Sequence, residues 1–599
     1  MLNGMLRAPR LLAVGLTALL LATSSHGFID PAFTPEDLVR SASAIRTGRM
    51  AVDDAGGWTL SKGRLLKGEL PATIELSPKG LPEKVREEVA RVLSDTDAGD
   101  AVAYLGEFGD DRVVYLHAGN TWLKAAPKSD EVWLIQGVND KRMNGTYNGA
   151  TRTLLRITEY LLANKDGAVP TNVGTRWLDR VKAGRAKAPV FGMRLVRPLG
   201  TSEQAHVHVF GEGGDSLWRV DGDGSFVDVT KQVGLSAASR HAVWMRRAGV
   251  KHASLFSVQD EQVCIYEWGE GKLQSTERIP LSADCIGLAA GRVGNRPAIV
   301  ISTPKLPLVA LEAEEKWIAK PLPVGFEMLS SAGDPAAAVV ADFNNDGYVD
   351  VLQPRAKHGL LWKGQAEGFA GAEQVAVTRG GSPAPAIEVG DWNADGRLDL
   401  FVSGPDASEL WQQDHEGRFR PVLNASGSLS YKGYPGAASA LATDLNHDGR
   451  PDLAVFYEKR AAPYHFNRGF GAMGEEGELP LDSGLVAAVA ADMNGDSSLD
   501  LLASQRDGTL IYMSNDLFDV PSLSIRLANG VAGPVTVSVW QGKGETAYCV
   551  GTVSVQSGHP SVAALRKSDK AIVRWRLPGK TERSVEVEVG NKTLPFVIE

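Results

Sequence analysis

The chain has 599 residues, of which 43% are hydrophobic and 23% are charged, with 65 glycines and 31 prolines. This length exceeds one ordinary core, and the composition is typical of a turn-rich β protein rather than a disordered chain or a helical bundle. The formal net charge is -9 and no concentrated run of Lys or Arg occurs, which excludes a surface adapted to nucleic acid.

Residues 1–27 have the pattern of an export signal. Arg7 and Arg10 precede an apolar run over 11–22, and small residues follow it. The run is shorter than the roughly 20 apolar residues that span a bilayer, and no later stretch supplies them. We therefore predict a cleaved signal peptide and a mature protein that begins near Phe28, without a transmembrane span. Its location would be secreted, periplasmic or on the cell surface, and an uncleaved anchor is the alternative.

Residues 28–188 alternate strand and helix patterns. Short β-rich runs bounded by turn residues predict strands, and two longer stretches have helical periodicity. These patterns indicate a small α+β domain, with an OB-like fold as an alternative. The predicted strands cover 58–66, 72–77, 101–108, 112–119 and 131–137, and the predicted helices cover 82–94 and 149–163.

An acidic segment recurs four times in the second half of the chain. Its copies are ADFNNDGYVDVL, GDWNADGRLDLF, TDLNHDGRPDLA and ADMNGDSSLDLL, and their first aspartates are separated by 49, 53 and 48 residues. Four short strands with their turns occupy about this length, as in one propeller blade. Each copy lies between an apolar stretch and an alternating one, which favours antiparallel meanders.

The same rhythm extends upstream without the acidic residues. Equivalent positions recur at steps of 45 to 53 residues, which predicts about seven blades between residues 189 and 518. The fold class expected is therefore mainly β: a β-propeller with an N-terminal α+β domain and a C-terminal β-sandwich-like domain over 519–599. The equivalent positions are Ala205, Ala253, Ala298, Asp350, Asp399, Asp452 and Asp500.

The repeated pattern DxNxDGxxD suits a calcium ion. Side-chain oxygens at positions 1, 3, 5 and 9 and the carbonyl of position 7 can meet at one point, and Ca²⁺ takes six to eight oxygen ligands. An Asx-turn hairpin without metal is the alternative for any single copy. Ser497 replaces the turn glycine in the fourth copy, which should make that site the weakest. The predicted ligands are Asp342, Asn344, Asp346, Tyr348 and Asp350; Asp391, Asn393, Asp395, Arg397 and Asp399; Asp444, Asn446, Asp448, Arg450 and Asp452; and Asp492, Asn494, Asp496, Ser498 and Asp500.

These four loops resemble the FG-GAP/VCBS repeats of integrin alpha-subunit propellers. The segment SLWRVDGDGSFVDVTKQVGL from Ser216 is similar to a hairpin of bacterial proteins of the ASPIC/UnbV group. The tail, with GPVTVSVWQGKGE, GTVSVQSGHPSV and a region around Trp575 and Pro578, resembles the ASPIC/UnbV domain. Arg576 and Leu577 stand between that Trp and Pro, and AALRK replaces the aromatic-glycine stretch of the family. The resemblance implies a calcium-binding propeller whose metals stabilise the fold.

The function that we expect is a calcium-binding platform for an extracellular protein or glycan. Ligand recognition is expected on the face opposite the metals, near 355–358 and 405–408. The alternative is a calcium-dependent carbohydrate-active enzyme of the polysaccharide-lyase kind, although no catalytic motif stands in a persuasive context.

Three further patterns have competing interpretations. Trp218, Trp362 and Trp411 recur at one blade position, where they could stack sugars as in a lectin or pack between strands. His206 and His208 share one strand face and could bind a metal, although ordinary strand histidines are commoner. Of the three cysteines, the two in the propeller region could pair or remain buried thiols.

Overall fold

The structure is a computed structural model, and most of the chain after residue 34 can be described. The described residues are 35–53, 56–93, 100–108, 111–119, 121–128, 132–138, 140, 143, 146–147, 151–163, 177–196, 205–221, 224–247, 250, 252–313, 316–378, 386–392, 395–403, 408–414, 416–421, 437–446, 451–457, 459–466, 477–479, 481, 483–494, 498–515, 521–528, 531, 533–542, 547–555, 561–565, 570–590 and 594–599.

The N-terminal part forms a closed ring of strands. The strand order is β2-β4-β8-β7-β6-β5-β1, a β1–β2 pairing joins its two ends, and β3 pairs with β1 outside the ring. Closure leaves no free edge in the ring. The strands are β1 (Ala44–Val52), β2 (Trp58–Ser61), β3 (Leu65–Lys67), β4 (Ile74–Ser77), β5 (Asp100–Phe108), β6 (Asp111–Ala118), β7 (Thr121–Pro127) and β8 (Val132–Val138).

Helices cover two sides of this ring. Val85, Val89 and Leu93 recur on one face of α2 (Glu83–Leu93) and pack into the ring interior, after the 3-10 turn Pro78–Gly80. Helices α1 (Pro35–Ser41) and α4 (Thr151–Ala163) pack on the outer face of β5, β6 and β7. The two predicted helices thus coincide with α2 and α4.

Seven four-stranded antiparallel sheets follow, between residues 177 and 515 of the described chain. Six of them take their strands in chain order. They are β10 (Val190–Val196), β11 (His206–Gly211), β12 (Ser216–Val220) and β13 (Phe226–Asp228); β14 (His241–Arg246), β15 (Ala253–Gln259), β16 (Gln262–Gly269) and β17 (Lys272–Pro280); β18 (Gly287–Val293), β19 (Arg296–Ser302), β20 (Leu308–Ala313) and β21 (Lys316–Pro321); β22 (Val339–Ala341), β23 (Asp350–Gln353), β24 (Gly359–Trp362) and β27 (Glu373–Val375); β28 (Ala386–Gly390), β29 (Asp399–Ser403), β30 (Ser408–Gln413) and β31 (Phe419–Pro421); and β32 (Ala437–Thr443), β33 (Asp452–Tyr457), β34 (Pro463–His465) and β35 (Gly477–Glu478).

The seventh sheet takes its outer strand from far upstream. Strands β36 (Leu485–Ala491), β37 (Asp500–Gln505) and β38 (Thr509–Asn515) are joined by β9 (Trp177–Arg185), which pairs with β38. Main-chain bonds from Ala186 to Gly508 and from Val190 to Arg506 continue this contact. Strand β9 precedes residue 189, where the sequence placed the start of the propeller.

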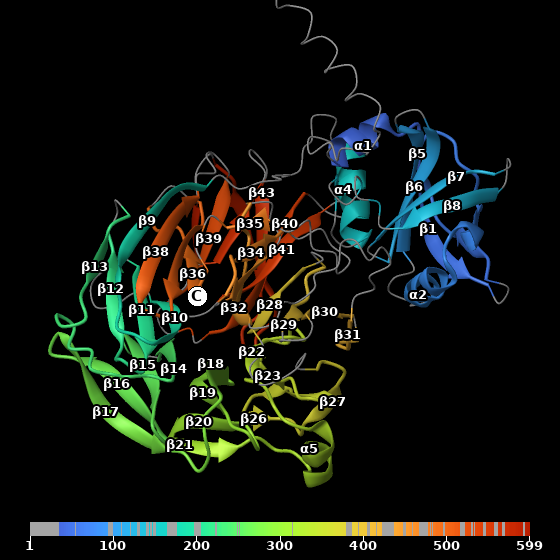
Figure 1. Ribbon diagram of the computed structural model, residues 1–599. Coiled ribbons are helices and arrows are strands. Elements are labelled where there is room, and N and C mark those ends of the chain that lie inside the picture. Colours follow the sequence, from blue (N-terminus) through green and yellow to red (C-terminus); the bar gives the residue numbers. More distant parts are fainter. Residues whose placement is uncertain are drawn as a thin grey trace, which may run out of the picture.

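Hydrophobic cores between neighbouring sheets close the arrangement into a ring. Each sheet shares one buried cluster with the sheet before it and another with the sheet after it, and the last sheet shares one with the first. Radial packing of meander sheets is the architecture of a β-propeller (Figure 1). The seven equivalent positions predicted from the repeat spacing lie within two residues of the start of the second strand in each sheet.

The C-terminal part, from β39 to β45, consists of two sheets, and we call it the C-terminal domain. One has the order β42-β39-β45, with β39 and β45 parallel, and the other has the order β41-β40-β43-β44. Their apolar faces share one core with α1 and α4 of the N-terminal part. In Figure 1 β40 and β41 lie between α4 and the propeller strands β28 and β32, and β41 contacts both α4 and β28. The strands are β39 (Ser522–Leu527), β40 (Val535–Gln541), β41 (Tyr548–Val555), β42 (Ser561–Ala564), β43 (Lys570–Trp575), β44 (Arg583–Glu588) and β45 (Leu594–Ile598).

Shorter elements complete the described structure. They are α5 (Phe326–Ala332) and the hairpin of β25 (Gly364–Gln365) and β26 (Gly368–Phe369). The predicted signal peptide lies outside the described residues, and within them no helix is long and apolar enough to cross a membrane. All three cysteines are free thiols.

Candidate metal centre

Each of the four acidic segments forms the turn between the first and second strands of its sheet. They connect β22 to β23, β28 to β29, β32 to β33 and β36 to β37. Because the sheets share one topology, these turns leave the ring on the same face. We call the segments 342–350, 391–399, 444–452 and 492–500 the acidic loops. Asn393, Asp448, Arg450 and Asp496 lie outside the described residues.

The first acidic loop is folded around its own carboxylates. Asp342 accepts the main-chain N–H of Asp346 at 3.1 Å and of Gly347 at 2.8 Å. Asp346 accepts the N–H of Tyr348 at 2.7 Å, and Asn344 Oδ1 accepts the N–H of Asp346 at 3.1 Å. These bonds fold the loop around the side chains of Asp342, Asn344 and Asp346.

The second acidic loop repeats this arrangement. Asp391 accepts the N–H of Asp395 and of Gly396, each at 3.0 Å. Arg397 donates its N–H to Asp395 at 2.9 Å, and its guanidinium forms an ion pair with the same carboxylate at 2.6 Å. Gly347 and Gly396 have φ values of 89° and 90°, a conformation that favours glycine.

The last aspartate of each acidic loop is a structural anchor. In all four loops one of its oxygens accepts the N–H of the second loop residue at 2.9 to 3.1 Å. In three of them the other oxygen accepts an N–H at the end of the third strand or just after it, from Gly364, Gln413 or Asn515. A carboxylate has about four acceptor positions, so these bonds leave capacity for a cation. The four anchors are Asp350, Asp399, Asp452 and Asp500, and each is fully buried.

Burial and mutual repulsion make these carboxylates costly to ionise without a cation. Burial raises the pKa of Asp342 to about 7, and the charge of Asp346 adds to the shift. Burial likewise raises the pKa of Asp350 to about 8 and of Asp391 to about 7. Burial is the main cause that raises the pKa of Asp399 well above its ordinary value, and the negative charges of Asp395 and Asp391 add to the shift. A bound cation would offset both effects.

The types of ligand atom in the acidic loops are those that calcium prefers. Hard oxygen donors, a turn glycine and several carboxylates in one loop are what Ca²⁺ requires. Within the described part of the chain, however, no three His, Cys, Asp or Glu side chains already converge as a metal cluster. Calcium thus stays a prediction, with Asp342, Asn344, Asp346 and Asp350 as the best described ligand candidates.

The C-terminal domain covers the first two acidic loops, which the sequence did not predict. Thr536 Oγ1 donates to the main-chain carbonyl of Asp342 at 3.1 Å, and Thr552 forms a side-chain hydrogen bond with Asp391. Strand β41 contacts β28, which leads into the second loop. Spacing within a repeat carries no information about which domain lies above it.

A matched pair of glycines should measure this contact. In Gly347→Ala the new Cβ would lie 2.7 Å from the carbonyl oxygen of Leu577, whereas in Gly396→Ala its nearest neighbour is Trp540 at 3.9 Å. Both variants carry the backbone strain, about 1 to 2 kcal/mol. We expect Gly347→Ala to lose at least about 1 kcal/mol more in urea unfolding, because only it also clashes with the C-terminal domain. Equal losses would contradict this packing.

Several other predicted site residues have structural roles. Trp218, Trp362 and Trp411 are at most 7% exposed and pack in cores between sheets, so their faces are not open to sugars. His208 is buried and bonds Asp215 at 3.0 Å. Arg355, in a turn expected to contact a ligand, is 4% exposed and bonds the carbonyl of Gly333 and the amide oxygen of Gln353.

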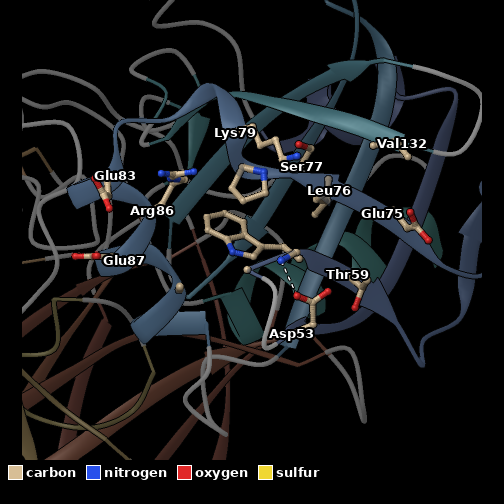
Figure 2. Close-up of a pocket in the computed structure, with 15 residues that line it drawn as sticks. Asp53, Thr59, Glu75, Leu76, Ser77, Lys79, Glu83, Arg86, Glu87 and Val132 are labelled. Carbon is tan, nitrogen blue, oxygen red and sulfur yellow. Dashed lines mark hydrogen bonds between the residues drawn. The ribbon is translucent and has the colours of Figure 1, made fainter.

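A second candidate site is a cavity of about 560 Å³ beside α2 (Figure 2). It is lined by residues of β2, β4 and α2, and its charged lining residues include Asp53, Glu75, Lys79 and Arg86. Trp58 also lines the cavity but is only 2% exposed, so its ring cannot stack on a sugar. The cavity combines both signs of charge and indicates no single ligand class.

Comparisons with known proteins agree with the repeat. The family of FG-GAP-like repeats matches residues 391–455 and 444–503. No curated protein matches the chain in sequence.

Three solved structures each resemble somewhat more than half of the chain. A lectin from Agrocybe aegerita that recognises non-reducing terminal N-acetylglucosamine is 14% identical, with a TM-score of 0.35, over 57% of this chain and 86% of its own. The β-propeller domain of Myceliophteria thermophila Cps50 (Swd1) is 11% identical, with a TM-score of 0.38, over 56% and 98%. A streptogramin B lyase is 10% identical, with a TM-score of 0.37, over 57% and 98%. These likenesses are weak, and the architecture rests on the strand pairing. The chain thus carries FG-GAP-like repeats within a β-propeller.

Proposed function

We propose that the chain is an exported, seven-bladed β-propeller that binds calcium in its acidic loops and serves as a binding platform for an extracellular protein or glycan. The observation that carries the proposal is the first acidic loop, where main-chain N–H groups hold Asp342, Asp346 and Asp350 in place although burial opposes the ionisation of Asp342 and Asp350. The repeat of this arrangement in the second loop supports it.

Calcium in this proposal is structural, and recognition is left to other surfaces. The C-terminal domain covers two acidic loops, so a large partner would bind elsewhere, for example on the face opposite the loops. The predicted contact near 355–358 would then involve Lys357 and His358 rather than the buried Arg355.

The test is a binding screen with the exported protein, whose N-terminal sequence should begin close to Phe28. We expect binding to one class of glycan or extracellular protein, and we expect it to persist in Asp395→Ala at temperatures where the fold is intact. If that variant kept its fold yet lost all binding, calcium would belong to the ligand site. Release of unsaturated sugars from a polysaccharide would instead support the lyase alternative.

A further inference from the structure

The C-terminal domain contacts the first residue of two neighbouring acidic loops. The hydroxyl of Thr536 donates to the main-chain carbonyl of Asp342, and this contact is buried. The hydroxyl of Thr552 bonds the carboxylate of Asp391 itself. Main chain of this domain also lies against the first loop, since a Cβ on Gly347 would clash with the carbonyl of Leu577. Cation ligands and domain contacts are thus provided by the same residues.

Each covered loop carries three aspartates, whose carboxylates repel one another when they are ionised. In the first loop Arg292 donates to the carbonyl of Gly347 at 2.8 Å and lies near Asp342 and Asp346, and the side chain of Arg576 packs against Gly347. In the second loop Arg397 forms an ion pair with Asp395.

This repulsion opposes coverage of the loops when no cation is bound. Asp342 is 2% exposed and Asp391 is fully buried in the docked arrangement. Ionised carboxylates removed from water without full compensation are strongly unfavourable. A cation in each loop offsets that penalty and also fixes the carbonyl and carboxylate that Thr536 and Thr552 contact.

The contact continues into the N-terminal domain. Trp540 lies next to Gly396 of the second loop, and the guanidinium groups of Arg156 and Arg574 lie over its ring, at 5.2 Å and 4.6 Å from the ring centroid. Arg156 belongs to α4 and also donates to the carbonyl of Ala547 at 3.1 Å. We propose that cation occupancy of loops 342–350 and 391–399 sets the docking of the C-terminal domain on the propeller. The N-terminal domain, attached through α4, would follow that docking; the inference rests on the proposed calcium binding.

Hydrogen exchange of the full-length mature protein tests this inference. Calorimetry with Ca²⁺ first establishes binding, and amide exchange is then followed with saturating Ca²⁺ and with a chelator. We expect the chelator to accelerate exchange in β40, β41 and α4 by at least about ten-fold. Exchange in β14 to β17, which lie in a sheet without an acidic loop, should change little.

The thermodynamic coupling between cation binding and domain docking provides a second experiment. If the cation promotes docking, docking must promote cation binding by the same factor. The double variant Thr536→Val/Thr552→Val keeps the shape of both side chains and removes both hydroxyls. It should bind Ca²⁺ at the covered loops on the order of five-fold more weakly than the parent. Thr276→Val, which removes a hydroxyl bond to the carbonyl of Ile265 inside a propeller sheet, is the matched control and should bind normally.

The outcomes separate the two proposals. If calorimetry detects no Ca²⁺ binding, the proposed function fails and this inference fails with it. If Ca²⁺ binds but exchange in β40 and β41 is the same with and without chelator, the loops bind metal and docking is independent of it. Faster exchange together with weaker binding in the double variant supports the inference.

Discussion

Chelation of calcium should lower the melting temperature of the mature protein by several degrees. A site with a dissociation constant of about 0.1 to 1 mM contributes roughly 0.4 to 1.4 kcal/mol at about 1 mM free calcium. Four such acidic loops would together contribute about 2 to 6 kcal/mol, a large part of an ordinary folding free energy. Calorimetric melting at a fixed scan rate, with 1 mM Ca²⁺ or with chelator, measures this shift.

Single-site variants assign the effect to the loops. Asp395→Ala should lower the melting temperature in calcium and remove part of its dependence on calcium, because it deletes one carboxylate of the second loop. Asp414→Ala is the control, since Asp414 lies in the same sheet but bonds Arg418 and Arg420 instead. It should destabilise the protein equally in calcium and in chelator. A calcium-independent melting temperature in the parent would exclude a stabilising metal.

Asp215→Ala should be among the most destabilising substitutions in the propeller, at about 3 to 5 kcal/mol. Asp215 is 1% exposed and accepts bonds from His208 Nε2 at 3.0 Å, from the Ser239 hydroxyl at 2.5 Å and from the Ser239 N–H at 2.9 Å. Ser239 also bonds Ser257 at 2.6 Å, so the network joins the sheet of β10 to β13 with the sheet of β14 to β17. Removing its centre leaves several buried polar groups without partners.

Urea unfolding measures this loss, and Asp507→Ala is the control. Asp507 lies in a comparable turn between the second and third strands of its sheet, but its side chain is 56% exposed. Its removal should cost less than about 1 kcal/mol. Similar losses in the two variants would contradict a central role for Asp215.

The contribution of Asp215 should also depend on pH. Burial acts to raise its pKa, but His208 and the Ser239 hydrogen bonds outweigh burial and leave the pKa below its ordinary value. A carboxyl whose pKa is lower in the folded state stabilises the fold above its unfolded pKa, about 3.9, and loses this effect as the pH falls through the folded value. The difference in unfolding free energy between the parent and Asp215→Asn should therefore shrink below about pH 4.

The repeating part of the fold could be predicted because its signals are local. The acidic loops and apolar strands lie within one blade length, so spacing alone located the second strand of all seven sheets. Strand β1 was not predicted, since Arg46 interrupts its pattern. That side chain is nevertheless buried and donates to the carbonyls of Gly63 and Leu70.

What the sequence could not predict are contacts between distant segments. The sequence of strand β9 contains no signal that identifies its partner. Its pairing with β38 depends on residues more than 300 positions away. The recurring tryptophans were compatible with both sugar stacking and packing, because the face of a strand that becomes covered depends on the neighbouring sheet. Coverage of the acidic loops by Thr536 and Thr552 likewise arises from the docking of whole domains.

The pairing of β9 with β38 determines the order in which the chain can complete its fold. Arg185 is synthesised early and its partner Thr509 late, so β9 presents an unpaired strand edge until almost the whole propeller exists. Long-range closure of this kind adds only about 0.6 kcal/mol for each doubling of loop length, but it delays folding and prolongs exposure to aggregation. A chain interrupted before β38 therefore cannot close its ring, however complete its other sheets are.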